Sequence, residues 1–125
     1  MKYDEFIDAV SERAGLPRDE AESLTHAVLR TLSERLSGGE AEDLRAQLPK
    51  GLQEDLIPTQ EEAQGFDVPE FTRRVVQRSG IDPADAAAAT AAVLSVLRDA
   101  VSAGEFDDVL SQLGLEYAAL IDAQT

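Results

Sequence analysis

The segment GEAEDLRAQL at residues 39–48 returns 65 positions later as GEFDDVLSQL at residues 104–113. The glycine, the first glutamate, the fifth-position aspartate, the glutamine and the final leucine are the same in both copies. Aligning residues 3–56 with 68–121 needs no gap and gives 17 identical positions. A match of this length, with glycines and apolar positions in register, indicates an internal duplication.

Each copy carries the spacing of amphipathic helices, with apolar residues three and four positions apart. In the first copy Gly15 ends one helix, Pro17 begins the next, and Pro49 ends a third, because the residue before proline is pushed out of helical dihedrals. In the second copy Asp67 is the expected N-cap of a helix that stops at Gly80. The predicted helices are 3–14, 17–36, 40–48, a short segment at 52–57, 68–79, 86–102, 105–113 and a last apolar segment at 117–121.

These patterns predict an all-α helical bundle built from two pseudo-symmetric three-helix repeats at an offset of 65 residues. Residues 1–125 form a single domain, in which the first repeat covers 3–57 and the second covers 67–121. Residues 58–66 have no apolar period and read as the connection. We expect the long second helix of each repeat to lie at the centre, about a pseudo-twofold axis.

The chain is strongly acidic, with 25 acids against 11 bases and a formal charge of -14 spread evenly along it. Such a surface repels phosphate backbones and anionic lipids, so neither nucleic acid nor a membrane is an expected partner. The chain has two lysines and is rich in alanine. This composition suits either a high-salt environment or a source with a GC-rich genome.

Neither membrane insertion nor disulfide chemistry is expected. No apolar run approaches the roughly 20 residues that span a bilayer, and the N-terminal residues lead directly into an amphipathic pattern instead of a signal peptide. The absence of cysteine excludes disulfides and thiolate metal sites. We therefore expect a cytoplasmic protein.

At the repeated segment the chain resembles a bacterial and archaeal family catalogued as domain of unknown function 2267. The resemblance rests on Phe6 and Phe71 in the opening helices, on the Arg-x-Gly stops, and on Gln47-Leu48-Pro49, whose counterpart in the second copy is Gln112-Leu113-Gly114. It implies an all-helical fold and supplies no catalytic residues.

The repeated acids Glu40, Asp43, Glu105 and Asp108 are the sharpest candidate site. Brought together across a pseudo-twofold axis, four carboxylates could bind a divalent cation through oxygen. Acids at the start of a helix also satisfy free N–H groups and the helix dipole. A third interpretation pairs Asp43 with Arg13 and Asp108 with Arg78 as a structural clasp; capping or the clasp is the favoured interpretation.

Two other features have simple structural interpretations. His26, the single histidine, has Ala91 as its counterpart and no specified nucleophile or orienting partner, so we expect a role at the edge of its helix and not in catalysis. The basic cluster Arg73, Arg74 and Arg78 could receive a phosphate or an acidic partner, although local pairing with nearby acids is the expected state.

The sequence predicts a non-enzymatic interaction or assembly module with no cofactor and no catalytic residues. Its partner would be another protein or a second copy of itself, for example in a homodimer. The alternative is a helical-bundle pocket that binds a small ligand or a divalent metal through acids at the repeat interface.

Overall fold

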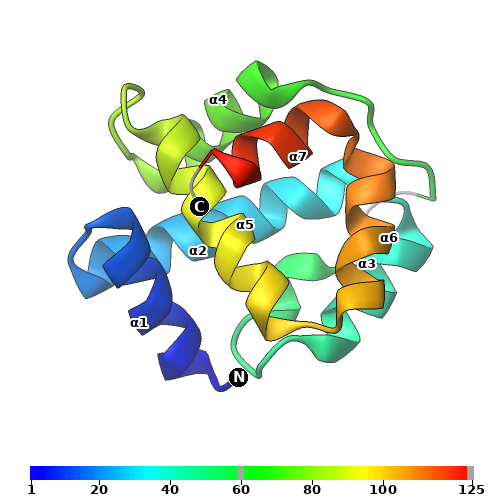
Figure 1. Ribbon diagram of the computed structural model, residues 1–125, viewed down its shortest axis with the longest axis horizontal. Coiled ribbons are helices and arrows are strands. Elements are labelled where there is room, and N and C mark those ends of the chain that lie inside the picture. Colours follow the sequence, from blue (N-terminus) through cyan, green and yellow to red (C-terminus); the bar gives the residue numbers. More distant parts are fainter. Residues whose placement is uncertain (59–60, 124–125) are drawn as a thin grey trace.

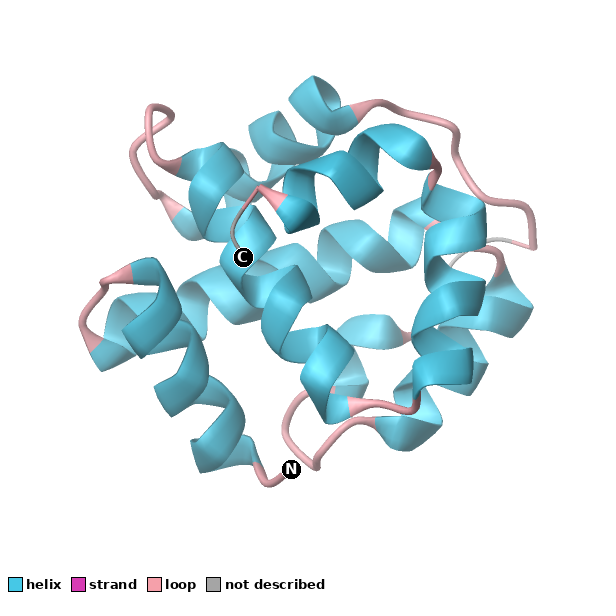
Figure 2. Ribbon diagram, viewed as in Figure 1, coloured by secondary structure: helices cyan, strands magenta, loops and turns pink. Residues whose placement is uncertain are grey.

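The computed structural model of the chain describes residues 1–58 and 61–123. Every regular element in these ranges is helical (Figure 2), which confirms the predicted all-α class. Among the described residues, no helix combines the length and the apolar character that a membrane span needs. The elements are α1 (Tyr3–Ala14), α2 (Arg18–Arg35), α3 (Gly38–Gln47), the 3₁₀ helix η1 (Gln53–Leu56), α4 (Val68–Ser79), α5 (Ala86–Ala100), α6 (Ala103–Leu113) and α7 (Leu115–Asp122).

The helix ends that carry strong local signals lie where the sequence predicts them. Helices α1 and α4 end at Gly15 and Gly80, whose φ angles of 67° and 76° are left-handed and favour glycine. At the start of α4 the side chain of Asp67 accepts a hydrogen bond from the backbone N–H of Glu70 at 3.0 Å. The rings of Phe66 and Phe71 lie 6.1 Å apart, as a hydrophobic staple requires.

Helices α3 and α6 begin two residues earlier than predicted, at Gly38 and Ala103. The cause is the residue before each of them. The hydroxyls of Ser37 and Ser102 accept hydrogen bonds from the backbone N–H groups of Glu40 and Glu105, at 3.3 and 3.2 Å. Serine is a favoured N-cap, so each helix starts directly after it and includes the repeated glycine, Gly39 or Gly104.

The two long helices α2 and α5 lie at the centre of the bundle (Figure 1). Helix α1 packs against both of them, and so does α4. Helix α3 packs against α6, η1 packs on α2, and α7 packs on α5. One continuous core results, and its largest fully buried side chains include Phe6, Phe71, Tyr117, Leu29, Leu32 and Leu94.

The two halves end differently. After α3, Pro49 leads into a turn at Gly51 and then into the short η1. After α6, the single residue Gly114 (φ 95°) separates it from the longer α7. Residues 61–66 pass the junction of α2 and α3, where the N–H of Gly38 donates to the carbonyl of Glu61 and the N–H of Gln64 donates to the carbonyl of Glu34; of the predicted connection 58–66, positions 59 and 60 lie outside the described residues.

Arg35, at the end of α2, holds the end of α6. Its guanidinium donates to the backbone carbonyls of Gln112 at 2.8 Å and Leu113 at 2.9 Å, and also to the carbonyl of Phe66 at 2.9 Å. The same group lies 5.2 Å from the centre of the Tyr117 ring. An arginine from the first half thus satisfies carbonyls that the last turn of a helix leaves free.

Candidate functional site

The predicted clasp arginines bind acids other than those expected. Arg13 donates to Asp99 at 2.6 Å and to the hydroxyl of Ser95 at 3.1 Å, both on α5. Arg78 lies 2.5 Å from Glu34 on α2. Within the described ranges neither arginine pairs with Asp43 or Asp108, because the ends of α1 and α4 pack against α5 and α2 and not against α3 and α6.

Arg78 is the more buried of the two arginines. It also donates to the hydroxyl of Thr31 at 2.8 Å, and Thr31 is fully buried. Arg74 and Arg73, the rest of the basic cluster, both bind Glu70 at 2.7 Å. The three arginines are therefore engaged by nearby acids, as local pairing predicts.

Two glutamines connect α3 and α6. Gln47 accepts a hydrogen bond from the backbone N–H of Ser102 at 2.7 Å, and its amide donates to the Ser102 hydroxyl at 3.3 Å. Gln112 binds Ser37 in the same two ways, at 2.8 and 3.0 Å. Each glutamine at the end of one helix therefore caps the start of the other.

Three of the four predicted metal-candidate acids come together at the start of these helices. One carboxylate oxygen from each of Glu40, Glu105 and Asp108 lies within 4.8 Å of the others. Glu40 is 8% exposed, and Glu40 Oε1 and Glu105 Oε2 are buried with no hydrogen-bond partner. The fourth acid, Asp43, is exposed and lies outside this group.

We refer to Glu40, Glu105 and Asp108 together as the carboxylate cluster. It places three acidic groups close to one another. Burial raises the pKa of Glu40 to about 8, and the facing carboxylate of Glu105 and the charges of Asp108 and Asp43 raise it further. At neutral pH, burial and these charges therefore favour the protonated, neutral form of Glu40.

His26 has partners that the sequence did not reveal. Its Nδ1 lies 2.5 Å from Asp55 Oδ2, and its Nε2 lies 3.2 Å from the hydroxyl of Tyr3. The Tyr3 hydroxyl donates to Glu22 at 2.6 Å, and Arg30 donates to Asp55 at 3.1 Å. The sequence specified no orienting partner for His26, and the structure supplies one: η1 carries Asp55 to α2, a contact between residues 29 positions apart.

This network is suited to holding η1 in place. The hydrogen bond to Asp55 is the main cause that raises the pKa of His26. Burial and then the hydrogen bond to Glu22 raise the pKa of Tyr3 to about 12, so at neutral pH the hydroxyl keeps the proton that it donates to Glu22. The side chain of Asp55 is 4% exposed, which leaves it little access to a substrate.

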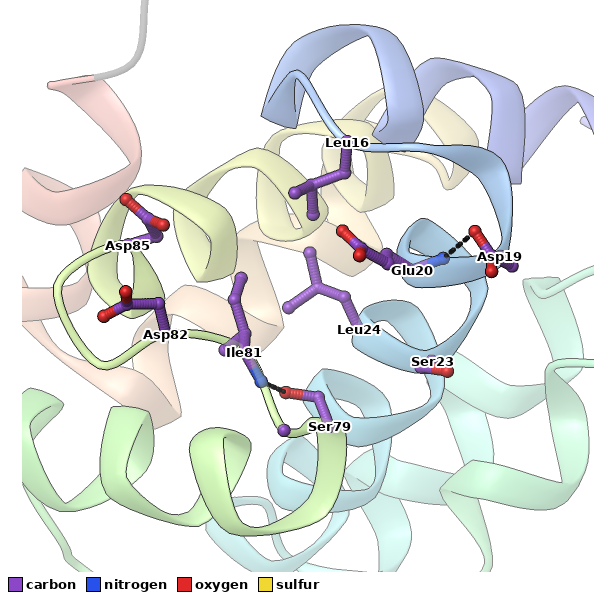
Figure 3. A pocket seen from close by; sticks show the side chains of 10 residues that line it. Leu16, Asp19, Glu20, Ser23, Leu24, Ser79, Ile81, Asp82 and Asp85 are labelled. Carbon is purple, nitrogen blue, oxygen red and sulfur yellow. Dashed lines mark hydrogen bonds between the residues drawn. The ribbon is translucent and has the colours of Figure 1, made fainter.

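A pocket of about 410 Å³ opens between the α1–α2 loop and the α4–α5 loop (Figure 3). The side chains of Leu16, Leu24 and Ile81 converge on it and make it apolar at its centre. A second hollow of about 260 Å³ shares Leu16 and Ile81 and extends along α5. The volume of the larger pocket lies in the range of ordinary ligand sites.

The rim of this pocket is acidic on two sides. Asp19 and Glu20 lie at the start of α2, and Asp82 and Asp85 lie at the start of α5, with the three apolar side chains between them (Figure 3). Within the described residues, no arginine, lysine or histidine pairs with any of these four carboxylates. The pocket thus offers unneutralised negative charge around an apolar centre.

Comparison with protein-family models matches residues 3–120 to the family described as "Uncharacterized conserved protein (DUF2267)". The chain belongs to this family. The match spans nearly its whole length, so the family resemblance stated from Phe6, Phe71 and the glutamine motifs is confirmed. No curated protein matches the chain. The description of the family assigns it no activity.

Proposed function

We propose that this chain is a non-enzymatic interaction module that receives a basic segment of a partner protein in the acidic pocket between the two loops. The observation that carries the proposal is the group of four carboxylates, none paired with a described cation, around Leu16, Leu24 and Ile81. A lysine or arginine side chain has the complementary form, because an aliphatic stem can lie on the apolar centre while its charge meets the rim.

The chemistry of the partner follows from charge. At a net charge of -14, a second copy would bring like charges together, whereas a basic partner is attracted from a distance. The large hydrophobic side chains that stay exposed in the described part are Met1, Ile57 and Leu115, and none of them lines the pocket. A basic segment is therefore favoured over the homodimer that the sequence left open.

The same pocket is the best place for the alternative function, binding of a small ligand. That ligand would be an organic cation with an apolar body, for the same reasons of charge and shape. The proposal keeps the cytoplasmic location expected from the sequence.

The proposal includes a duplicated architecture, with residues 3–57 and 67–121 as two repeats of one domain. The support for this architecture is that residues and contacts of one half have counterparts in the other. Leu16 and Ile81, at the centre of the pocket, are 65 positions apart, as are the two capping glutamines. The contact of Arg13 with Asp99 has a counterpart in the contact of Arg78 with Glu34. The two arginines are 65 positions apart, and so are the two acids.

An NMR titration tests the proposed function. The ¹⁵N-labelled chain is titrated with a blocked peptide of alternating leucine and lysine, and in parallel with n-hexylammonium. Peptide binding should shift the amide signals around Leu16, Glu20, Ile81 and Asp85 and should weaken at least tenfold in the double variant Glu20→Gln/Asp85→Asn. Asp85 makes no side-chain capping bond, so the variant should keep its fold.

The matched control is Glu54→Gln/Glu116→Gln, which removes the same charge from exposed positions outside the pocket. Equal weakening in both variants would mean diffuse attraction to an acidic surface and would contradict a pocket. Binding of n-hexylammonium at these amides without any binding of the peptide would favour the small-ligand alternative.

A further inference from the structure

Glu40 and Glu105 do not make the hydrogen bond that glutamates at their positions in a helix normally make. In a capping box, a serine N-cap is followed three residues later by a glutamate whose side chain accepts from the N-cap N–H. Ser37 and Glu40 have this spacing, and so do Ser102 and Glu105. Here the N–H groups of both serines are already bound by Gln112 and Gln47.

The two glutamates turn toward each other instead. Helices α3 and α6 pack together (Figure 1), and their third residues bring two carboxylates to one place beside Asp108. Gln47 donates weakly to Glu105 Oε1, at 3.5 Å. Glu40 Oε1 and Glu105 Oε2 remain buried without a partner, and an unpaired buried oxygen is costly.

The spacing of the oxygens fits one hard cation. Calcium binds oxygen at about 2.3–2.6 Å and magnesium at about 2.0–2.1 Å, so two oxygens on one ion lie no more than about 5 Å apart. The three ligand atoms of the cluster lie within 4.8 Å of one another. Asp108 is exposed, which leaves water free to complete the coordination.

We propose that Glu40, Glu105 and Asp108 together bind one divalent cation of the calcium–magnesium class, which ties α3 to α6. The buried, unpartnered oxygen of Glu40 is the observation that distinguishes this cluster from ordinary surface acids. A single shared proton would join Glu40 to Glu105 but would leave Asp108 repelled by the remaining negative charge. The raised pKa of Glu40 agrees with a site that needs a positive occupant.

The cation would act on the structure and would require no partner protein. The cluster draws on neither loop that forms the acidic pocket, so this inference is independent of the proposed function. A bound ion would add a link between the first and second halves of the chain beside the two glutamine caps. Stability should therefore depend on the free concentration of the ion.

The test is calorimetric titration of the metal-depleted chain with calcium chloride and with magnesium chloride at fixed ionic strength, combined with thermal unfolding. Saturation with one ion per chain should raise Tm by at least roughly 3 °C. Glu40→Gln/Glu105→Gln should lose this response, and Asp108→Asn should weaken binding at least tenfold. The charge-matched Glu54→Gln/Glu116→Gln should respond as the natural chain does.

The variant Glu40→Gln/Glu105→Gln also shows whether a lost response to metal could come from misfolding. Two facing amides can hydrogen-bond to each other, so its Tm without metal should equal or exceed that of the natural chain. No heat and no change in Tm with either ion would overturn the proposal in favour of a shared proton. An equal response in all variants would overturn it in favour of nonspecific binding to the acidic surface.

Discussion

The side-chain amide of Gln112 makes two hydrogen bonds with Ser37, which lies 75 positions away in the sequence. Its oxygen accepts from the Ser37 backbone N–H at 2.8 Å, and its nitrogen donates to the Ser37 hydroxyl at 3.0 Å. Gln47 binds Ser102 in the same way, so the start of each short helix is capped by the other half of the chain. The stability of α3 and α6 is therefore joined to the contact between the halves.

Replacing these glutamines should destabilise the whole fold, not one helix. Because Gln112 is half-buried and Gln47 is exposed, we expect a loss of about 1–2 kcal/mol for Gln112→Ala and about 0.5–1 kcal/mol for Gln47→Ala. Chemical denaturation measures both. A double-mutant cycle with Ser37→Ala should show coupling for Gln112 and none for Gln47.

The arginine pairs should differ in strength. Arg78 and Glu34 have side chains 33% and 23% exposed, whereas Arg13 and Asp99 are 40% and 47% exposed. We expect a loss of roughly 1–2 kcal/mol for Arg78→Ala and no more than about 1 kcal/mol for Arg13→Ala, because exposed pairs contribute little. Equal losses, or a larger loss for Arg13, would show that packing of the arginine stem and not the ion pair dominates.

Stability should fall as the pH rises through the range of the carboxylate cluster. The pKa of Glu40 is raised from 4.5 to about 8, so the folded chain keeps a proton that the unfolded chain loses between these values. The free-energy cost of ionising Glu40 in the folded chain is absent below pH 4.5 and complete above about pH 8. Glu40→Gln should flatten this slope and stabilise the chain by about 1–2 kcal/mol at pH 8. Denaturation at several pH values, without divalent ions, measures the effect.

His26 should add a second contribution of the same sign. Its pKa is raised, chiefly by the hydrogen bond to Asp55, so its stabilisation is fully present below pH 6.5 and is lost as the pH rises through the higher folded pKa. His26→Gln should cost about 1–2 kcal/mol at pH 5.5 and less at pH 8. The slope due to Glu40 should remain in this variant. A loss that does not change with pH would mean that the imidazole is neutral throughout.

Any side chain at Gly51, in the turn after α3, should lower the stability of the fold. Its φ is 95°, and an added Cβ would lie 2.9 Å from the Tyr3 ring. We expect Gly51→Ala to cost about 2–3 kcal/mol, the sum of backbone strain and displacement of Tyr3. Gly114→Ala is the matched control, because Gly114 has the same φ and open space around it. Equal unfolding free energies in the two variants would show that the ring moves aside freely.

Local chemistry was enough to predict most of the helices. Apolar spacing and the glycine stops placed α1 and α4 at their observed bounds, since helix period and left-handed caps depend on neighbouring residues alone. The starts of α3 and α6 were missed, although Ser37 and Ser102 stood among the identical positions of the alignment and carried the serine-to-glutamate spacing of a cap.

Side-chain partners could not be predicted in the same way, because they depend on which helices cross. The sequence showed that Arg13, Glu40 and Gln47 recur with their counterparts, and so marked them as important. Only the packing of α1 on α5 and of α3 on α6 decided that Arg13 meets Asp99 and that Glu40 meets Glu105. A helix determines which residues share its face, whereas the distance between two faces is determined by the burial of the whole core.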